Sequence, residues 1–599
     1  MTRRDHRHNI KTPHAMVLVW NYRDRVSTWN AGLSGDDTSS GLSRNDVNSI
    51  EPVIISTVSL KSISTSKVKG EPNGDFEITL APTKNWVSTI SPGSWCCILL
   101  SQEKITEEDI KRADPKKLKM LGKITSVRVN RQKNQDSGAT ITSYTVLGED
   151  WGHIFNNNVY LDPLALSANS QTPSGAIKIF QEQYAESISK NGLPPTNDII
   201  SVLVGLWGQS INEFLDEATQ DNLKIVVATN KEYIIPKELS RWLQINNNEI
   251  GLSGIVESHK QFGVLKKEGD NITYDSDTVE SVSLMTPQDL VGVNSLWQLF
   301  NHYCNPVLNE VLCDLDFEDD KPRLRLWKRV RPFLVSRENE DRIKNDDYLN
   351  SISPEFTDIP KTVIPIDEVI SFDAGTNWRD KYNFIEVRLD SAFRSTGLDN
   401  QIKLDSQIFD AESFQREGFR PMFATSRNIV PMDIAGGNSQ EPLLLTRWKY
   451  LLKEWYFDTH RMLNGTISLI GQNKHIPIGS NIMIDARSFT DTRNANLAHA
   501  VGAVSHLLMH VESVSHSFSV DEDGRRHYMT NISFVRGIFT DKNGEVVSLI
   551  NDSLDKGIDV DGRLDMDTRT LNPQDDKNEK TTFGTSDAND PDPQKLRGR

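Results

Sequence analysis

Two histidines in the segment HLLMH have a spacing that could support chemistry in this 599-residue chain. His506 and His510 are four residues apart and superficially offer a pair of metal ligands. The surrounding residues predict a strand, however, in which positions i and i+4 lie roughly 13 Å apart along the backbone. We therefore expect no metal at this pair. His516 lies on the apolar face of the same strand, where we expect a hydrogen-bonded packing residue.

Acidic residues provide two further candidate sites. The segment DKGIDVDGRLDMD (555–567) superficially resembles a calcium loop, but its glycine has the wrong offset and the closing Glu is missing. It is better interpreted as a solvated acidic tail. Adjacent carboxylates occur at Glu149 and Asp150 and again at Asp319 and Asp320, yet a chain with 83 acidic residues contains such pairs by chance. A glycosidase needs two carboxyls at a set separation across a cleft, which this pattern does not indicate.

One basic cluster, RLRLWKRVRPF (323–333), lies in a predicted strand. Arg323 and Arg325 share one face and Lys328 lies on the other. The cluster could bind phosphate or an acidic partner, or it could be a solvated face that pairs with nearby acids; both interpretations stay open. Walker A, G-x-S-x-G, H-E-x-x-H and G-x-G-x-x-G motifs are absent from the sequence. We therefore predict no enzyme activity, no catalytic residue, no metal and no cofactor.

Composition and charge limit the classes of partner. The formal net charge of -16 disfavours a nucleic acid as the main partner. Cys96, Cys97, Cys304 and Cys313 show neither C-x-x-C nor zinc-site spacing, which is typical of thiols in a reduced compartment. The basic N-terminus precedes a six-residue apolar run, too short for a secretory signal, and no stretch approaches the roughly 18 apolar residues of a membrane span. We expect a protein folded in the cytoplasm, without membrane insertion.

The predicted elements that position these residues are mainly strands. Short β-branched runs from residue 53, separated by Gly and Pro turns, predict a small antiparallel barrel or sandwich. Helical spacing appears within 164–305, and strands return from about residue 311. One helix at 442–463 interrupts them with an apolar stripe of Leu444, Trp448, Leu451, Leu452 and Trp455.

A long antiparallel hairpin is predicted at 509–539, around the turn Asp-Glu-Asp-Gly. Apolar residues fall on one face of each run: Val514, Phe518 and Val520 in the first, and Tyr528, Ile532 and Phe534 in the second.

The plan is two β domains separated by a largely helical insertion. The expected boundaries are an N-terminal arm or linker at 1–50, a first β domain at 51–160, a mixed, mostly helical insertion at 161–310, a second β domain with a packed helix at 311–545, and an acidic flexible tail at 546–599.

Four segments, in this order, resemble the baseplate hub proteins of contractile-tailed bacteriophages, which are related to type VI secretion spike hubs. They are YTVLGEDWGHIFNNNVYLDP, NPVLNEVLCDLDFEDDKPRLRLWKRVRPF, IPIGSNIMI and the hairpin that finishes with Phe534, Arg536 and Gly537. The resemblance covers about 51–160 and 295–545. It leaves the insertion and both termini uncovered.

The resemblance implies an α+β, mainly β fold with two tail-tube-like antiparallel β-barrel domains, a largely helical insertion and flexible termini. It implies a structural homotrimer that forms a pseudo-sixfold ring in the virion, assembled in the host cytoplasm. Such a ring would join the tail tube protein ring to the central spike protein and the baseplate wedge proteins, with the tape measure protein as a further partner. Genomic DNA would pass through it only in transit.

Two alternatives stay open at this stage. One is the spike hub of a type VI secretion or tailocin particle, although the C-terminal tail looks short for a spike or effector domain. The other is a tail-associated peptidoglycan hydrolase with its active site within 160–305. Because Arg is favoured at interfaces, the candidate partner-interface residues are Trp151, Arg331, Arg388 and Arg536.

Overall fold

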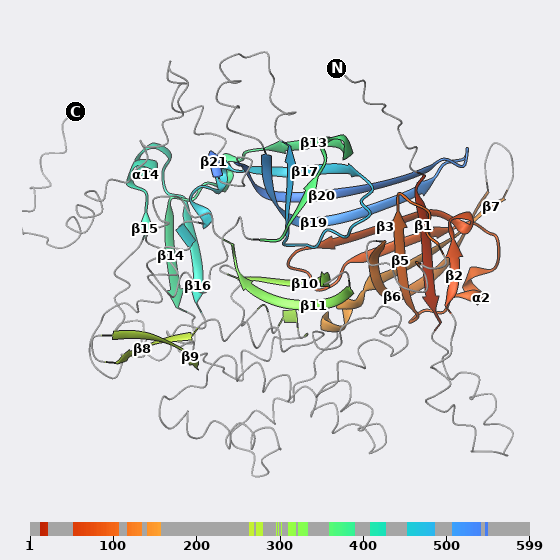
Figure 1. Cartoon of the computed structure of the whole chain (residues 1–599), viewed down its shortest axis with the longest axis horizontal. Coiled ribbons are helices and arrows are strands. Elements are labelled where there is room, and N and C mark those ends of the chain that lie inside the picture. Colours follow the sequence, from red (N-terminus) through yellow and green to blue (C-terminus); the bar gives the residue numbers. More distant parts are fainter. Residues whose placement is uncertain are drawn as a thin grey trace, which may run out of the picture.

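The computed structural model describes part of the chain, drawn in colour in Figure 1. The described residues are 12–21, 52–106, 109, 117–133, 140–156, 263–268, 271–279, 295, 297–298, 301, 309–318, 321–332, 359–389, 408–426, 452–453, 455–485, 506–540 and 546–548. The predicted calcium-like segment and most of the predicted insertion lie outside them.

Seven antiparallel strands form what we call the first β module, in the order β3-β4-β7-β6-β5-β1-β2. These strands are β1 (His14–Trp20), β2 (Val53–Ser56), β3 (Leu60–Val68), β4 (Asp75–Leu80), β5 (Trp95–Ser101), β6 (Leu118–Lys133) and β7 (Thr140–Asp150). Strand β5 is buried along its whole length, because β1 and β6 pair with its two edges and both faces carry apolar residues. Residues 14–20, expected in an N-terminal arm, are thus part of a sheet.

Seven further strands form the second β module: β12 (Lys361–Ile364), β13 (Val369–Gly375), β17 (Leu463–Ile470), β18 (Asn481–Asp485), β19 (His506–Val520), β20 (Arg526–Thr540) and β21 (Val546–Ser548). Its main order is β13-β17-β20-β19, with β18 also paired to β19 and β12 parallel to β18. The predicted hairpin is confirmed as β19 and β20, joined by a turn in which Gly524 has φ +75°.

The hairpin joins the two modules into a single 14-stranded sheet. Strand β19 pairs antiparallel with β3, from Ser513 opposite Val68 to Ser519 opposite Ser62, and Figure 1 shows these strands side by side. Hairpin residues far from the turn, such as Leu507 and Phe534, belong to the core of the second module. Phe518 and Tyr528, near the turn, belong to the core of the first.

The prediction of two β-barrel domains is therefore wrong. Among the described residues no barrel closes, because β3 uses its outer edge to pair with β19 and the sheet continues from one module into the other. The two sheet-end strands, β2 and β13, remain at opposite ends of this strand order.

Smaller elements complete the described fold. Two hairpins, β8 (Gly263–Glu268) with β9 (Asn271–Val279) and β10 (Asn309–Glu318) with β11 (Lys321–Val330), accompany a three-stranded sheet of β14 (Phe384–Leu389), β15 (Ile408–Phe409) and β16 (Pro421–Ser426). The α-helices are α2 (Trp86–Thr89) and α14 (Ala411–Glu417). The 3-10 helices are η2 (Thr57–Ser59), η3 (Trp151–Asn156), η6 (Ile366–Glu368), η7 (Trp378–Asp380) and η10 (Thr459–Arg461).

The prediction of a largely helical insertion at 161–310 is also wrong for its described residues. They form β8, β9 and the start of β10, and only 297–298 and 301 are helical. The sequence contains a Gly-Asp pair between two strand-like runs, which favours a β-hairpin. The polar composition around it concealed this signal. From the predicted helix at 442–463, helical residues are described at 452–453 and 455–456, with Leu452 and Trp455 buried. No helix in the described ranges has the length and apolar character needed to cross a membrane.

Candidate functional site at the junction of the two β modules

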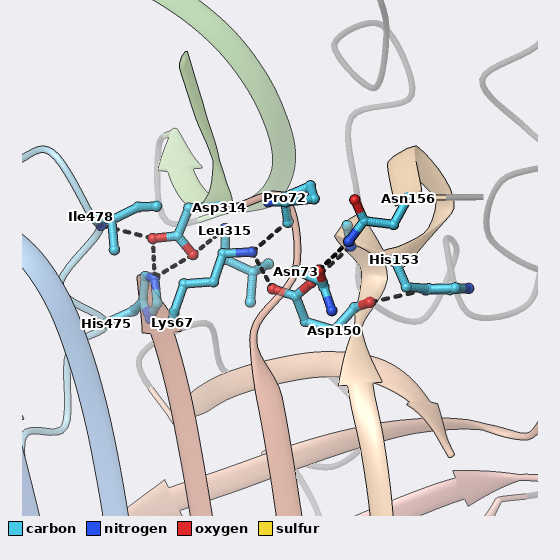
Figure 2. Close-up of polar contacts among 11 residues, drawn as sticks. Lys67, Pro72, Asn73, Asp150, His153, Asn156, Asp314, Leu315, His475 and Ile478 are labelled. Carbon is cyan, nitrogen blue, oxygen red and sulfur yellow. Dashed lines mark hydrogen bonds and ion pairs between the residues drawn. The ribbon is translucent and has the colours of Figure 1, made fainter. Parts of the chain in front are cut away.

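A buried ion pair lies where the first module meets β10. The Lys67 ammonium, near the end of β3, pairs with the Asp150 carboxylate at the end of β7 and donates a hydrogen bond to the carbonyl of Pro72 at 2.7 Å (Figure 2). The other Asp150 oxygen accepts a hydrogen bond from the Gly152 amide at 2.8 Å. Glycine is required at position 152, because a Cβ there would lie 1.8 Å from the Pro72 carbonyl oxygen.

Burial and the neighbouring charges shift the pKa values of this pair in opposite directions. Burial raises the pKa of the Asp150 carboxyl to about 6, against the opposing effect of the Lys67 ammonium. Burial is the largest single effect on the Lys67 pKa and acts to lower it, but Asp150, Cys313 and Asp314 together outweigh it, and the net shift is upward. Both groups are therefore charged at neutral pH, and each charge is compensated inside the protein.

Asp314 on β10 provides a second buried carboxylate close by. It accepts hydrogen bonds from the backbone amides of Ile478 at 2.8 Å and Leu315 at 2.7 Å, and His475 Nε2 lies 3.3 Å away. Because His475 and Ile478 precede β18, the carboxylate ties the β10–β11 hairpin to the second module (Figure 2).

These groups surround a small cavity of about 20 Å³. Its lining includes Lys67, Asp150, Asp314, Trp151 and His516. That volume is about the size of one water molecule, whereas small-molecule sites measure roughly 300–1,000 Å³. The cavity is therefore part of a packed polar junction and has no room for a substrate.

His516 behaves as a packing residue of this junction. Burial lowers its pKa well below the usual value, so the ring is neutral. Its Nδ1 lies 3.0 Å from Thr530 Oγ1, which agrees with the hydrogen-bonded role expected from the sequence.

A second cluster, which we call the ionic cluster, is centred on Lys69. The Lys69 ammonium contacts the Glu310 carboxylate at 2.8 Å and also the Glu512 carboxylate. His510 Nε2 lies 3.3 Å from Glu310, and its Nδ1 lies 2.9 Å from the side-chain oxygen of Asn481. The cluster thus joins the end of β3, β10, β18 and β19.

Three members of the ionic cluster, Glu310, His510 and Glu512, offer ligand atoms within 4.8 Å of one another. Their types suit a metal ion, but the Lys69 ammonium already contacts both carboxylates. Arg331 adds a second positive charge 3.8 Å from Glu310. We therefore interpret the cluster as a lysine-centred ionic network.

Arg536 extends this network into the second module. Its guanidinium lies 2.9 Å from the ring centroid of Trp455 and donates a hydrogen bond to the Trp455 carbonyl. Strand β20 carries one extra residue here relative to β17, and Arg536 has φ +58°. Such bulges redirect a side chain, and this one places a long cation over an aromatic ring in the interior.

The structure brings some of the predicted interface residues together and separates others. Arg331 and Arg536 meet at Trp455, and Trp151 is buried with its ring edge-on to Phe155. Arg388 belongs to β14, in the separate three-stranded sheet, and its side chain is not described. A role for these four residues between chains stays a prediction.

Sequence reasoning missed the lysines and glutamates that hold the junction. One signal was present for Lys67. In alternating positions along β3, Lys67 lies on the same face as Ile63 and Thr65, and all three side chains are buried. Glu310 and Glu512 carried no such signal, because their partners come from distant parts of the chain.

The sheet-end strands offer the other candidate functional feature. Ile54 on β2 and Ile370 on β13 are each about half exposed, and Val58 and Val363 nearby are more exposed still. A sheet edge presents unpaired backbone groups that can pair with another chain. The two ends of the described sheet therefore combine backbone hydrogen-bonding capacity with exposed apolar side chains.

No protein-family model and no curated protein matches this sequence. Among solved structures, the chain is similar to the 43 kDa tail protein of prophage MuSo2 from Shewanella oneidensis, with 10% identity, a TM-score of 0.34 and coverage of 81% of this chain and 95% of that one. It is similar to the tail protein from Neisseria meningitidis MC58, with 10% identity, a TM-score of 0.34 and coverage of 81% and 93%.

A third similar structure is the lidded PdpA-VgrG complex of Francisella, with 7% identity and a TM-score of 0.33. The match covers 88% of this chain and 53% of that one. At these identities and TM-scores the three similarities do not establish a common fold.

Proposed function

We propose that this chain is a structural subunit of a contractile-tail particle, a hub that works by symmetric assembly and not by catalysis. The observation that supports this proposal most is the shared hairpin β19–β20. It inserts into both cores and joins the two β modules into one sheet, which ends on strands with exposed apolar side chains. A single sheet with exposed end strands is expected of a load-bearing subunit whose sheet pairs with the sheets of neighbouring copies.

In the proposed assembly, three chains place six β modules around an axis. Strand β13 of one copy pairs with β2 of the next, so that the exposed edges are removed. Such a ring is compatible with a sixfold tail tube on one side and a threefold central spike on the other, with wedge proteins around it and the tape measure protein as a further contact. The net charge of -16 would repel DNA and let it slide through the ring.

Mass and shape test this proposal together. Light scattering of the purified chain should give three times 67.7 kDa, and electron micrographs should show rings. Ile370→Lys, at the β13 edge, should abolish the rings because it places a charge in the pairing surface. Val87→Lys is the matched control, since Val87 is exposed to a similar degree and lies on helix α2, outside the sheet.

Two results would contradict the proposal. One is a well-folded monomer at high concentration. The other is release of soluble fragments from purified cell walls, which would favour the peptidoglycan hydrolase.

A further inference from the structure

The three-stranded sheet β15-β14-β16 and helix α14 carry an unusual outer face. All the exposed Phe and Trp side chains of the described residues lie in this module or in η7, which contacts it through Arg420 and Trp378. Their exposed fractions are 37–55%: Trp378, Phe409, Phe414, Phe419 and Phe423. We call the four phenylalanines of this set, with Phe384 at their centre, the aromatic face.

The aromatic face is continuous. The Phe384 ring lies 4.9 Å from that of Phe419 and 6.5 Å from that of Phe423, and the Phe414 and Phe419 rings lie 5.9 Å apart. Phe409 stands directly opposite Phe384 in the β14–β15 register.

The other face of this sheet is buried and supplies the module's own core. Ile385 and Val387 on β14 and Ala424 on β16 are buried, and alternation along both strands separates them from Phe384 and Phe423. An antiparallel or mixed sheet with one solvated face normally carries polar residues on that face. Here the solvated face is aromatic, so the module has apolar surface beyond what its core needs.

The size of this surface suits an interface between proteins. Its four exposed phenylalanines and the adjacent Trp378, of about 150–250 Å² each and close to half exposed, leave roughly 400–600 Å² of apolar surface. A stable interface buries about 800 Å² per partner, of which the centre is the apolar part. Arg420 stacks 3.3 Å from the centroid of Trp378 beside the face, and Arg and Trp are among the residues that contribute most at such interfaces.

Charge indicates the partner. Residues 376–389 and 408–426 contain five basic and five acidic side chains and are neutral overall, although the whole chain carries -16. A neutral surface gives no long-range attraction to a nucleic acid or to an anionic membrane. It also allows two copies of this acidic chain to approach without repulsion at the contact.

We propose that the aromatic face docks against a second copy of this chain. The inference rests on the proposed function only in that both require self-association, and it places the contact on a module separate from the β2 and β13 edges.

Removal of two rings tests the contact. The double variant Phe419→Ser, Phe423→Ser should fold, because both side chains are about half exposed, and a normal circular dichroism spectrum and melting curve would verify this. Sedimentation velocity should then show a dissociation constant for self-association at least tenfold weaker than that of the wild type. The matched control is Val129→Ser, since Val129 is 48% and Phe423 47% exposed. Equal association of the double variant and the wild type would overturn the inference.

Cross-linking identifies the occupant. A photo-reactive phenylalanine analogue at position 419, in a mixture of isotopically light and heavy chains, should give cross-links between chains. Cross-links confined to one chain would show that the chain covers its own aromatic face, and they would overturn the inference.

The edge variant separates this inference from the proposed function. If Ile370→Lys dissociates the assembly and the Phe double variant does not, the aromatic contact is refuted and the edge-paired ring stands. The reverse pattern supports the aromatic contact and removes the edge pairing. A wild-type chain that stays monomeric at every concentration overturns the inference.

Discussion

At the scale of single residues, the junction depends on two lysines that are two positions apart. Lys67 forms an ion pair with Asp150, and Lys69 forms ion pairs with Glu310 and Glu512. Each joins segments that are far apart in the sequence. Buried ion pairs add little net stability when compared with apolar residues, but loss of one partner leaves an uncompensated charge. The function of these lysines is therefore to hold particular segments together.

Lys67→Met should lower the free energy of unfolding by about 3–5 kcal/mol, because the buried Asp150 carboxylate would lose its counter-ion. Denaturant titration measures this difference. Asp521→Asn is the control, because Asp521 forms an exposed pair with His527, and such pairs contribute about 1 kcal/mol or less. Equal losses in the two variants would show that the Lys67–Asp150 pair is not an essential contact.

The same carboxyl gives a defined pH dependence. Its folded-state pKa of about 6 lies above the unfolded value, so the folded protein binds the proton more tightly. The contribution of Asp150 to stability is therefore fully present below about pH 4 and is lost as the pH rises through about 6. The stability of the wild type relative to Asp150→Asn should fall between pH 4.5 and pH 7.5, measured by denaturant titration at each pH. A difference that grows over this range would refute the assignment.

Gly152→Ala tests the close approach of backbone segments at the junction. Its new methyl group would clash with the Pro72 carbonyl, so we expect a loss of about 2 kcal/mol or more in thermal or denaturant unfolding. Gly375→Ala is the control, since a Cβ there meets nothing within 4 Å, and it should change stability by less than about 0.5 kcal/mol.

At the scale of elements, the pairing of β3 with β19 decides the architecture. Ser64→Pro removes a backbone donor from β3, which has a partner on each side, and should cost about 3 kcal/mol or more. Lys361→Pro at the first residue of β12 should cost far less, because proline is tolerated there. Hydrogen exchange of β19 amides should speed up in the first variant only.

The alternation of apolar and polar residues predicted where strands lie better than it predicted which strands pair with each other. The alternation in 509–539 was enough to place β19 and β20 and most of their buried residues, because each face is set by parity. The pairing of β19 with β3 joins segments more than 440 residues apart, and no local signal specifies it. The barrel prediction failed for this reason.

The junction itself was the least predictable part. Single charged residues such as Lys69 and Glu310 look like surface positions in the sequence, and only the tertiary arrangement buries them together. The sequence also showed no sign that a one-residue bulge turns Arg536 inward onto Trp455. The aromatic face was missed because its central residue, Phe384, comes from a different segment than Phe409, Phe419 and Phe423.

At the scale of the whole molecule, a shared hairpin should make the two modules unfold together. Each core contains residues from β19 and β20, so loss of one core removes part of the other. We expect hydrogen exchange in β5 and β18 to report the same opening free energy, and calorimetry to show one transition for both modules. Two resolved transitions, with β5 protected after β18 has opened, would contradict this expectation.

The order of synthesis gives the hairpin a further consequence. The ribosome completes strands β1 to β7 long before it reaches Phe518 and Tyr528, which the core of the first module needs. N-terminal domains commonly fold while the rest of the chain is still being made. In this protein the core of the first module includes residues from β19 and β20, which are synthesised much later. The first module therefore cannot complete its core in a nascent chain until translation has passed about residue 530.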